Sequence, residues 1–333
     1  MAKGYKETEY MYSSARIRAL ENKLVGREDM MRLADAEDVK SVISAMDSYG
    51  FEPVYGSSGE FLREDTLMRV LERGFADVLE MECAPAVRFL QYQYDCNNIK
   101  AIIKCAARNI SPDAMLLPIG TVSPDEAKTA FANKDYSKYP DCMKKAIPEA
   151  EGAFAATANP QKIDFIIDKA CMADMLNTAK KTGIPLAKKL AEAKIDLVNI
   201  MQAIRISRMG LVQEAESLVK EVYIDGGTVD KKRVINAVYD MDEFLKELRR
   251  GQYDKLEPLV SSGASLAELE RKVDNIYFDI AKDAKWVPFG AEVAIGYIFA
   301  LEYEIKNIRL VLAGKEAGLS PATIKERLRE SYV

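Results

Sequence analysis

Carboxylates placed close together are the residues of this chain that could most easily perform chemistry. Paired acids serve glycosidases and metal-dependent enzymes only when the fold brings them to one site. The chain carries 52 acidic residues, so neighbouring acids also arise on solvated helix faces without a function. We interpret the close pairs in that second way. They are Glu64 with Asp65, Glu80 with Glu82, and Asp240 with Asp242.

The chain contains no histidine, the commonest acid–base residue and a frequent metal ligand. This excludes Ser-His-Asp and Cys-His catalysis and disfavours zinc and di-iron sites. The cysteines are odd in number and show no C-x-x-C spacing, so we expect small, buried, reduced thiols. We predict no catalytic residue, no metal and no cofactor. The five cysteines are Cys83, Cys96, Cys105, Cys142 and Cys171.

Nucleotide and nucleic-acid binding are also disfavoured. The sequence has no Walker loop, and the nearest approach, Ala313-Gly314-Lys315, lacks the first glycine and the following hydroxyl. Gly226-Gly227 is interpreted as a turn. The net charge of -5, with both signs mixed, argues against nucleic acid. The apolar run Val293 to Leu301 is too short for a bilayer, which needs about 20 residues, so we predict no transmembrane span.

The elements that would position these residues are helices. Apolar residues between Thr66 and Met81 follow the three-and-four spacing of one helical face. Asn159-Pro160 is a typical helix start, and Gly183 a typical stop. Further starts are predicted at Ser123 and Ser265, each with a glutamate three residues later. The pattern predicts an all-α protein.

Smaller features complete this prediction. Ser320-Pro321 is expected to open a last helix that directs Ile324, Leu328 and Val333 toward the core. Breaks are expected near Ile147-Pro148, at Gly226-Gly227 and in the run from Leu117 to Gly120. The only tryptophan, Trp286, and a set of helical aromatic residues are predicted to lie in the core. That set is Tyr92, Tyr94, Tyr277, Phe278, Tyr297, Phe299 and Tyr303.

An internal repeat is the most informative pattern. Three segments each place an acid three residues before an Asn-Ile pair, and the asparagines lie 101 (199 − 98) and 108 (307 − 199) positions apart. The first two copies also place a cation, Lys104 or Arg205, six residues after the asparagine. Such spacing predicts three helical repeat domains, 1–120, 121–224 and 225–333. The repeated polar positions are Asp95 and Asn98, Asp196 and Asn199, and Glu304 and Asn307.

These positions are expected to be structural. Asparagine is a poor interior helix residue because its side chain competes for backbone hydrogen bonds. An acid three residues earlier lies on the same helical face and could accept from the amide. Both could then satisfy polar groups where helices cross. A contact with a shared partner remains the alternative.

Several segments, in order, resemble one known family, the C subunits of archaeal and bacterial V/A-type ATPases, which are related to the eukaryotic d subunit. The N-terminal run from Tyr12 to Glu21 resembles the family's opening helix. The closing run is the most specific. It comprises Glu302 to Arg309, Gly314-Lys315, Ile324 to Leu328, and Tyr332-Val333. Matching segments between them are Gly26 to Leu33, Tyr49-Gly50, Asn97 to Lys100, and Leu116 to Thr121.

The resemblance implies three similar helical domains around a pseudo-threefold axis, forming a funnel. It implies a non-catalytic central-stalk protein that joins the shaft of the D and F subunits to the membrane proteolipid ring, for proton or sodium transport. Such a chain would lie peripherally on the cytoplasmic face of the membrane. Two other classes remain. A helical scaffold unrelated to ATPases would share the repeat, and an all-α enzyme would show a deep pocket with perturbed carboxylates.

Overall fold

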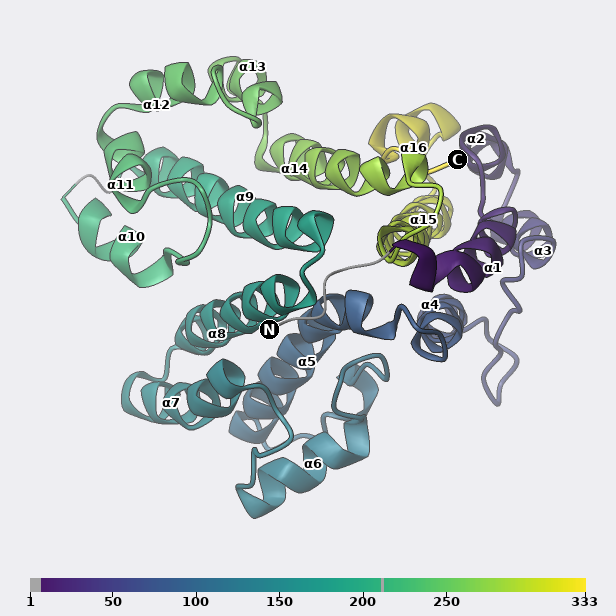
Figure 1. The fold of residues 1–333 in the computed structure, drawn as a ribbon, viewed down its shortest axis with the longest axis horizontal. Coiled ribbons are helices and arrows are strands. Elements are labelled where there is room, and N and C mark those ends of the chain that lie inside the picture. Colours follow the sequence, from purple (N-terminus) through teal and green to yellow (C-terminus); the bar gives the residue numbers. More distant parts are fainter. Residues whose placement is uncertain (1–6, 211–212) are drawn as a thin grey trace. The chain divides into compact units, whose positions relative to one another are not determined.

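A computed structural model describes residues 7–210 and 213–333 of the chain. Within these ranges the regular elements are helices, with one isolated antiparallel bridge between Tyr55 and Phe61 (Figure 1). The all-α prediction is confirmed. The α-helices are α1 (Met11–Glu21), α2 (Arg27–Asp35), α3 (Val39–Asp47), α4 (Arg63–Leu79), α5 (Ala84–Ala107), α6 (Pro124–Asn133), α7 (Asp141–Thr157), α8 (Pro160–Thr182), α9 (Pro185–Met209), α10 (Ala215–Val222), α11 (Lys231–Tyr239), α12 (Met241–Leu248), α13 (Glu257–Ser261), α14 (Leu266–Ala281), α15 (Glu292–Glu316) and α16 (Pro321–Arg327).

The described residues divide into two compact units. One unit covers Arg88–Tyr277, and the other covers residues 7–87 together with Phe278–Val333. The second unit therefore combines an N-terminal and a C-terminal segment of the chain, which are separated in sequence by the first unit. The three repeat domains and their pseudo-threefold arrangement stay a prediction.

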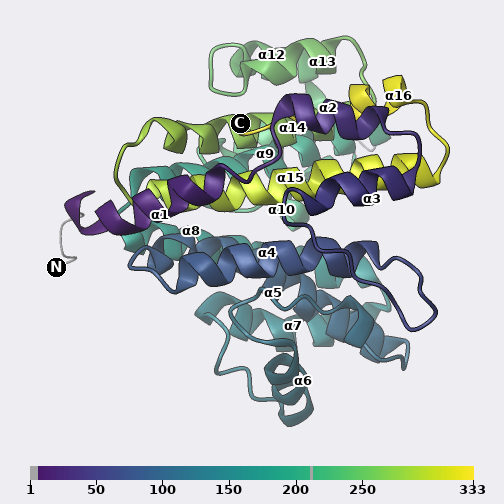
Figure 2. The ribbon, with the colours of Figure 1, turned by 90° about the vertical axis from the view of Figure 1, so that its right-hand side faces the viewer.

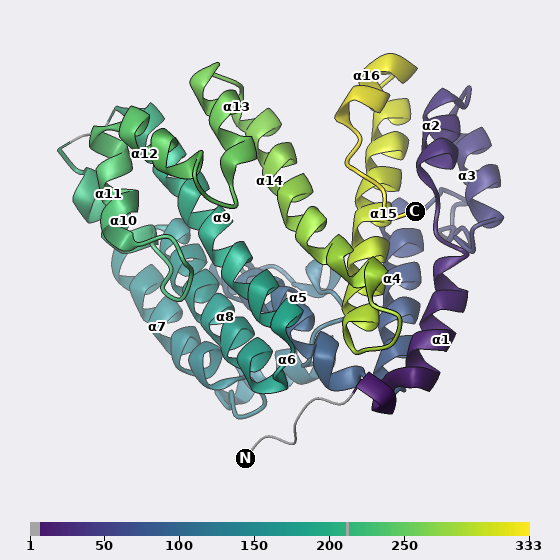
Figure 3. The same ribbon diagram turned by 45° about the horizontal axis from the view of Figure 1, so that its top comes forward.

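In the Arg88–Tyr277 unit, three long helices pack one after another. The helix α7 packs along α8, and α8 packs on α9 (Figure 3). On another side α9 carries α10 and α11, and α11 packs against α12. Ile200, Ile204, Val219 and Val234, none of them accessible to solvent, belong to the apolar core of these four helices. The helix α9 thus lies at the centre of this unit.

The other unit is centred on α15. This helix is apolar around most of its circumference, as expected of a helix buried on all sides. The helices α1 and α4 lie along it, and α2, α3 and α16 also contact it (Figure 2). Tyr303 of α15 stacks on Phe278, with ring centroids 4.0 Å apart.

Several sequence predictions of helix boundaries are confirmed. The predicted helix over Thr66–Met81 is α4. The side chain of Asn159 caps α8, and Gly183 ends it in the left-handed conformation with φ 72°. Ser123 forms a capping box at α6, and Ser265 bonds Glu268 in the same reciprocal way. Ser320 caps α16.

Three local predictions are wrong. The expected break near Pro148 is absent, since α7 continues to Thr157 with the proline inside it. Proline removes one backbone hydrogen bond, but the helix retains its packing along α8 through a buried face. Val333 is 43% exposed rather than directed into the core. The buried residues of α7 are Met143, Ala146, Ile147 and Ala150.

Trp286 is the third wrong prediction, because its side chain is 83% exposed. It ends a 3-10 helix, Lys282–Trp286, whose buried residue is Ala284. The guanidinium of Arg18 donates to the carbonyls of Ala284, Lys285 and Val287, which fixes this turn with the indole outward. Of the seven other aromatic residues predicted to be core, six are buried and Tyr277 is half-buried.

Candidate functional site

The first repeated pair fixes the loop that follows α5. The side chain of Asn98 donates to the carbonyl of Leu117 and accepts from its N–H, both at 2.8 Å. The Asp95 carboxylate accepts from the Thr121 N–H at 3.0 Å, the Thr121 hydroxyl at 2.6 Å and the Val122 N–H at 3.1 Å. Both side chains are fully buried. They join one helix to one loop by five hydrogen bonds.

The second pair, on α9, repeats this arrangement bond for bond. Asn199 donates to the carbonyl of Ile224 at 2.8 Å and accepts from its N–H at 3.0 Å. Asp196 accepts from the Thr228 N–H at 2.7 Å, the Thr228 hydroxyl at 2.6 Å and the Val229 N–H at 2.8 Å. Ile224 and Thr228 thus take the places of Leu117 and Thr121, and in both loops the two residues are four positions apart. The repeat in sequence is a repeat of hydrogen bonds.

The third pair, on α15, keeps half of the pattern. Asn307 donates to the carbonyl of Arg329 at 3.2 Å and accepts from its N–H at 2.8 Å. Glu304 accepts from the N–H of Val25 at 3.3 Å, a residue 279 positions away. Val25 precedes the N-cap of α2, as Val122 precedes that of α6. The third copy is therefore completed by a distant segment of the chain.

These partners differ from the ones expected from the sequence. The pattern predicts that the acid and the asparagine bond each other at a helix crossing, whereas the bonds described above join each of them to the backbone of a loop. The sequence prediction does not identify these loop residues, because it considers only the repeated acids and asparagines. The loop residues recur in the sequence as well. Gly120-Thr121-Val122 recurs as Gly227-Thr228-Val229, 107 positions later (227 − 120). That tripeptide is the sequence signal that could identify them.

Steric overlap explains why both copies of that tripeptide begin with glycine. A Cβ atom added at Gly120 would overlap Oδ1 of Asp95, and one added at Gly227 would overlap Oδ1 of Asp196. Each carboxylate accepts three hydrogen bonds from the loop and cannot withdraw without breaking them. Glycine is therefore required for the loop to approach the helix this closely.

Burial changes the acidity of two of these carboxyls. Burial raises the pKa of Asp95 to about 6, although the bonds from Thr121 and Val122 oppose the shift. Burial raises the pKa of Glu304 further, to about 8, with the single bond from Val25 opposing it. The second oxygen of Glu304 is buried without a hydrogen-bond partner in the described structure. Glu304 also lines a cavity of about 270 Å³.

Two tyrosines face the repeated aspartates. The hydroxyl of Tyr253 donates to Asp196 at 2.8 Å. Burial and then the charge of Asp95 raise the pKa of Tyr139, whose buried hydroxyl has no partner in the described structure. Asp196 thus accepts a hydrogen bond from a tyrosine, whereas Asp95 acts on Tyr139 through its charge.

Cations near the asparagines tie the same helices to a further helix. Lys100 and Lys104 of α5 pair with Asp168 and Asp164 of α8, at 2.7 Å and 2.5 Å. Arg205 of α9 pairs with Glu270 of α14 at 2.6 Å. Arg309 of α15 pairs with Glu64 of α4 at 2.9 Å. Each helix that carries the repeated pair is therefore also linked by charge to another long helix in its unit.

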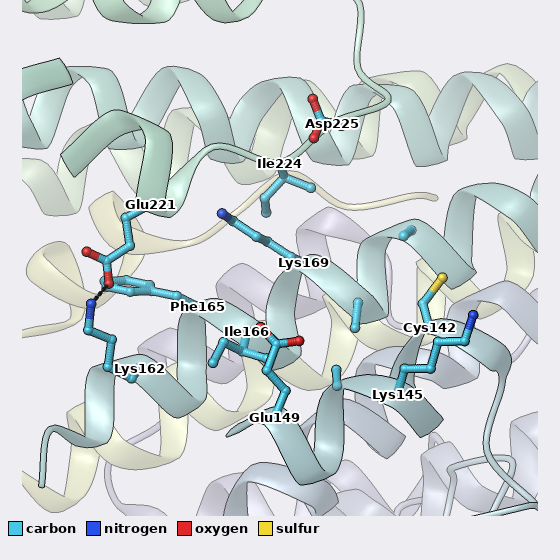
Figure 4. A pocket seen from close by; sticks show the side chains of 13 residues that line it. Cys142, Lys145, Glu149, Lys162, Phe165, Ile166, Lys169, Glu221, Ile224 and Asp225 are labelled. Carbon is cyan, nitrogen blue, oxygen red and sulfur yellow. Dashed lines mark hydrogen bonds and ion pairs between the residues drawn. The ribbon is translucent and has the colours of Figure 1, made fainter. Parts of the chain in front are cut away.

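Two larger cavities open in the Arg88–Tyr277 unit. The first, of about 600 Å³, lies between α7, α8 and the segment from α10 to Asp225 (Figure 4). Its floor includes Phe165 and Ile166, and Lys162 pairs with Glu221 at its edge. The second, of about 680 Å³, is bordered by Thr121, by the start of α7 and by the end of α8.

The remaining sequence candidates are distributed over several elements, and among them Cys96 of α5 lies next to Cys171 of α8. Glu64 and Asp65 begin α4, Asp240 caps α12, and four of the five cysteines are buried while Cys142 is half-buried. Among the described residues, no group of three or more His, Cys, Asp or Glu side chains could hold a metal ion. No described helix is long and apolar enough to span a bilayer.

Comparisons with known proteins agree with one another. A family model described as ATP synthase (C/AC39) subunit matches residues 13–327. The chain is 24% identical over 343 residues to the C subunit of the A-type ATP synthase of Thermococcus onnurineus, covering 97% of this chain and 90% of the relative. It is 22% identical over 329 residues to the C subunit of the V-type sodium ATPase of Enterococcus hirae, covering 97% and 99%. It is 25% identical over 341 residues to the C subunit of the A-type ATP synthase of Methanosarcina mazei, covering 96% and 92%.

Proposed function

Since the chain belongs to the family of ATP synthase (C/AC39) subunits, we propose that it is the non-catalytic central-stalk subunit of a rotary V/A-type ATPase. It would join the shaft of the D and F subunits to the membrane proteolipid ring and so couple ATP turnover to proton or sodium transport. The observation that carries this proposal is the family match over residues 13–327, nearly the whole chain. The protein would lie peripherally on the cytoplasmic face, attached through the ring.

The hydrogen bonds of the repeats support a mechanical role. A protein that transmits torque must resist deformation, and close-packed helices have low compressibility. Loops are the deformable elements of a helical protein. Here Asp95 fixes a loop to α5 and Asp196 fixes a loop to α9, each by three hydrogen bonds to the carboxylate. Hydrogen bonds to an ionised acid are stronger than those between neutral groups.

We assign the repeated acids and asparagines this structural role rather than a partner contact. Asp95, Asn98, Asp196, Asn199 and Asn307 are at most 1% exposed, and Glu304 is 7% exposed. Their described partners belong to this chain. A partner could reach them only if the loops that cover them moved away.

The proposal is tested by purification from membranes. An affinity tag placed ahead of Met1 leaves the bond between Arg27 and Val333 untouched. After solubilisation in mild detergent, mass spectrometry should identify the A, B, D and F subunits and the proteolipid with the tagged chain. Their absence, from membranes shown to contain an intact rotary ATPase, would contradict the proposal and favour an unrelated helical scaffold.

A further inference from the structure

The cavity of about 680 Å³ in the Arg88–Tyr277 unit is basic. Its lining combines Arg88 and Tyr92 from the N-terminal half of α5, the loop at Thr121, the start of α7 and the end of α8. Two acids, Asp141 and Asp174, also line it. The cationic residues of the lining are Arg88, Lys138, Lys180 and Lys181.

Most of this positive charge is free. Arg88, Lys180 and Lys181 are exposed, and their side chains form no hydrogen bond or ion pair within the described residues. Lys138 pairs with Glu126 at 2.6 Å. Three cations without a hydrogen-bonded or ion-paired partner therefore line the cavity, and the charge of Arg88 also acts on the buried Asp95.

The two acids of the lining do not cancel this charge. Asp174 is 4% exposed and accepts from the N–H groups of Cys142 and Met143, at 3.1 Å and 2.8 Å. Its charge is thus committed to the first turn of α7, where a helix favours an anion. Asp141 is the only acid of the lining that is exposed.

The neighbouring cavity of Figure 4 shows that this imbalance is specific. That cavity is lined by three lysines and three acids. Lys162 pairs with Glu221, and Lys169 donates to the carbonyl of Lys220 at 3.3 Å. Its charges are balanced, and two of its cations already have partners.

The walls of the basic cavity are already fixed. Thr121 is bonded to Asp95 through both its N–H and its hydroxyl. The hydroxyls of Tyr92 and Thr178 lie 3.1 Å apart and share a hydrogen bond. A site whose walls are ordered before binding loses less entropy when a ligand arrives. Asn177, exposed at the edge, offers an amide that could bond a peptide backbone.

We propose that this cavity binds an acidic segment, one with several carboxylate side chains, of a neighbouring protein in the same ATPase. This inference rests on the proposed function. A volume of about 680 Å³ is in the range of sites for ligands much larger than a single phosphate or carboxylate. Because the free cations come from both α5 and α8, several carboxylates on one segment can pair with them at once. Such complementary charge gives both specificity and fast association.

Charge reversal tests the role of the cations. The double variant Lys180→Glu/Lys181→Glu should dissociate from the complex purified from membranes on the order of tenfold faster than the wild-type chain. This difference should become smaller at high salt, which screens the charges. The control Lys232→Glu/Arg250→Glu changes net charge equally at exposed residues outside the lining and should behave as wild type. Because Lys180 and Lys181 end α8, Arg88→Glu serves as a second variant should that helix be destabilised. Equal dissociation of the reversed and control variants would overturn the proposal.

A photo-crosslinker identifies the segment itself. With p-benzoylphenylalanine at Asn177, irradiation of the intact complex should link this chain to a peptide rich in Asp and Glu from another protein of the ATPase, and the same residue at Lys232 should not. A linked peptide without acidic character, or no link at all, would overturn the inference while the co-purified ATPase proteins still support the proposed function. Recovery of no ATPase protein with the wild-type chain would instead contradict the proposed function.

Discussion

Each repeated asparagine bonds the N–H and the carbonyl of a single loop residue, as one residue of a β-strand bonds the residue opposite it. The amide is suited to this because it offers both donors and an acceptor. Aspartate could accept the N–H but would leave the carbonyl unpaired. The residue type at these three positions thus follows from the backbone groups that it satisfies.

Replacement of one such amide should be costly. In Asn199→Leu the N–H and the carbonyl of Ile224 lose their partner while Ile224 stays buried. Each unsatisfied buried group costs roughly 1–3 kcal/mol, so the loss of two partners should lower the free energy of unfolding by about 2–6 kcal/mol. Urea unfolding measures this. Asn177→Leu, at an exposed site of α8, is the matched control and should change it by about 0.5 kcal/mol or less. Equal effects of the two substitutions would refute a structural role for Asn199.

Glu304 should make stability depend on pH. Its pKa is raised to about 8 in the folded state, so below that pH the folded state retains a proton that the unfolded state has released. The free energy of unfolding should therefore fall as pH rises from the unfolded pKa, near 4.5, to about 8. Glu304→Gln, which cannot ionise, should lose most of this slope and exceed wild type by on the order of 3 kcal/mol at pH 8.

The comparison is clearest between pH 6 and 8, above the pKa of about 6 of Asp95. Unfolding in urea at several pH values measures the slope, and Glu28→Gln, at an exposed residue, is the control that should keep it. The same slope in wild type and Glu304→Gln would show that Glu304 is ionised in the folded protein.

At the scale of elements, each of the two loops bonded by Asp95 and Asp196 depends on a glycine. Gly227→Ala should lower the free energy of unfolding by about 1–3 kcal/mol, because its Cβ would displace the bonded carboxylate of Asp196. Gly152→Ala is the matched control. No atom lies within 4 Å of its added Cβ, and it sits inside α7, so it should raise stability by about 0.5–1 kcal/mol. Thermal unfolding separates the two, and a neutral Gly227→Ala would show that the loop approaches less closely.

The helices could be predicted from sequence where local signals decide. Caps such as Asn159 and Ser320 act within three residues, and their effect does not depend on the rest of the fold. The predictions for Pro148 and Trp286 are wrong because packing decides their positions. The buried face of α7 keeps the helix intact, and three bonds from Arg18 fix the turn that exposes the indole.

At the scale of the whole molecule, the three copies are distributed over both compact units. Two copies, on α5 and α9, lie in the Arg88–Tyr277 unit, and the third, on α15, lies in the other. The sequence shows where the acids and asparagines recur but not what they bond. Val25 and Glu304 lie 279 positions apart, and nothing local to either residue predicts their contact. A basic cavity assembled from α5, α7 and α8 is beyond sequence patterns for the same reason.

The proposed role of this chain, to couple ATP turnover to ion movement, can be tested in membranes. The most direct measurement is ATP-driven uptake of protons and of sodium ions by membrane vesicles from cells that lack the chain, with ATP hydrolysis followed in parallel. Hydrolysis by the A/B head should persist, uptake of the transported ion should be lost, and addition of the purified chain should restore uptake. Uptake at the wild-type rate without the chain would contradict the proposed coupling role.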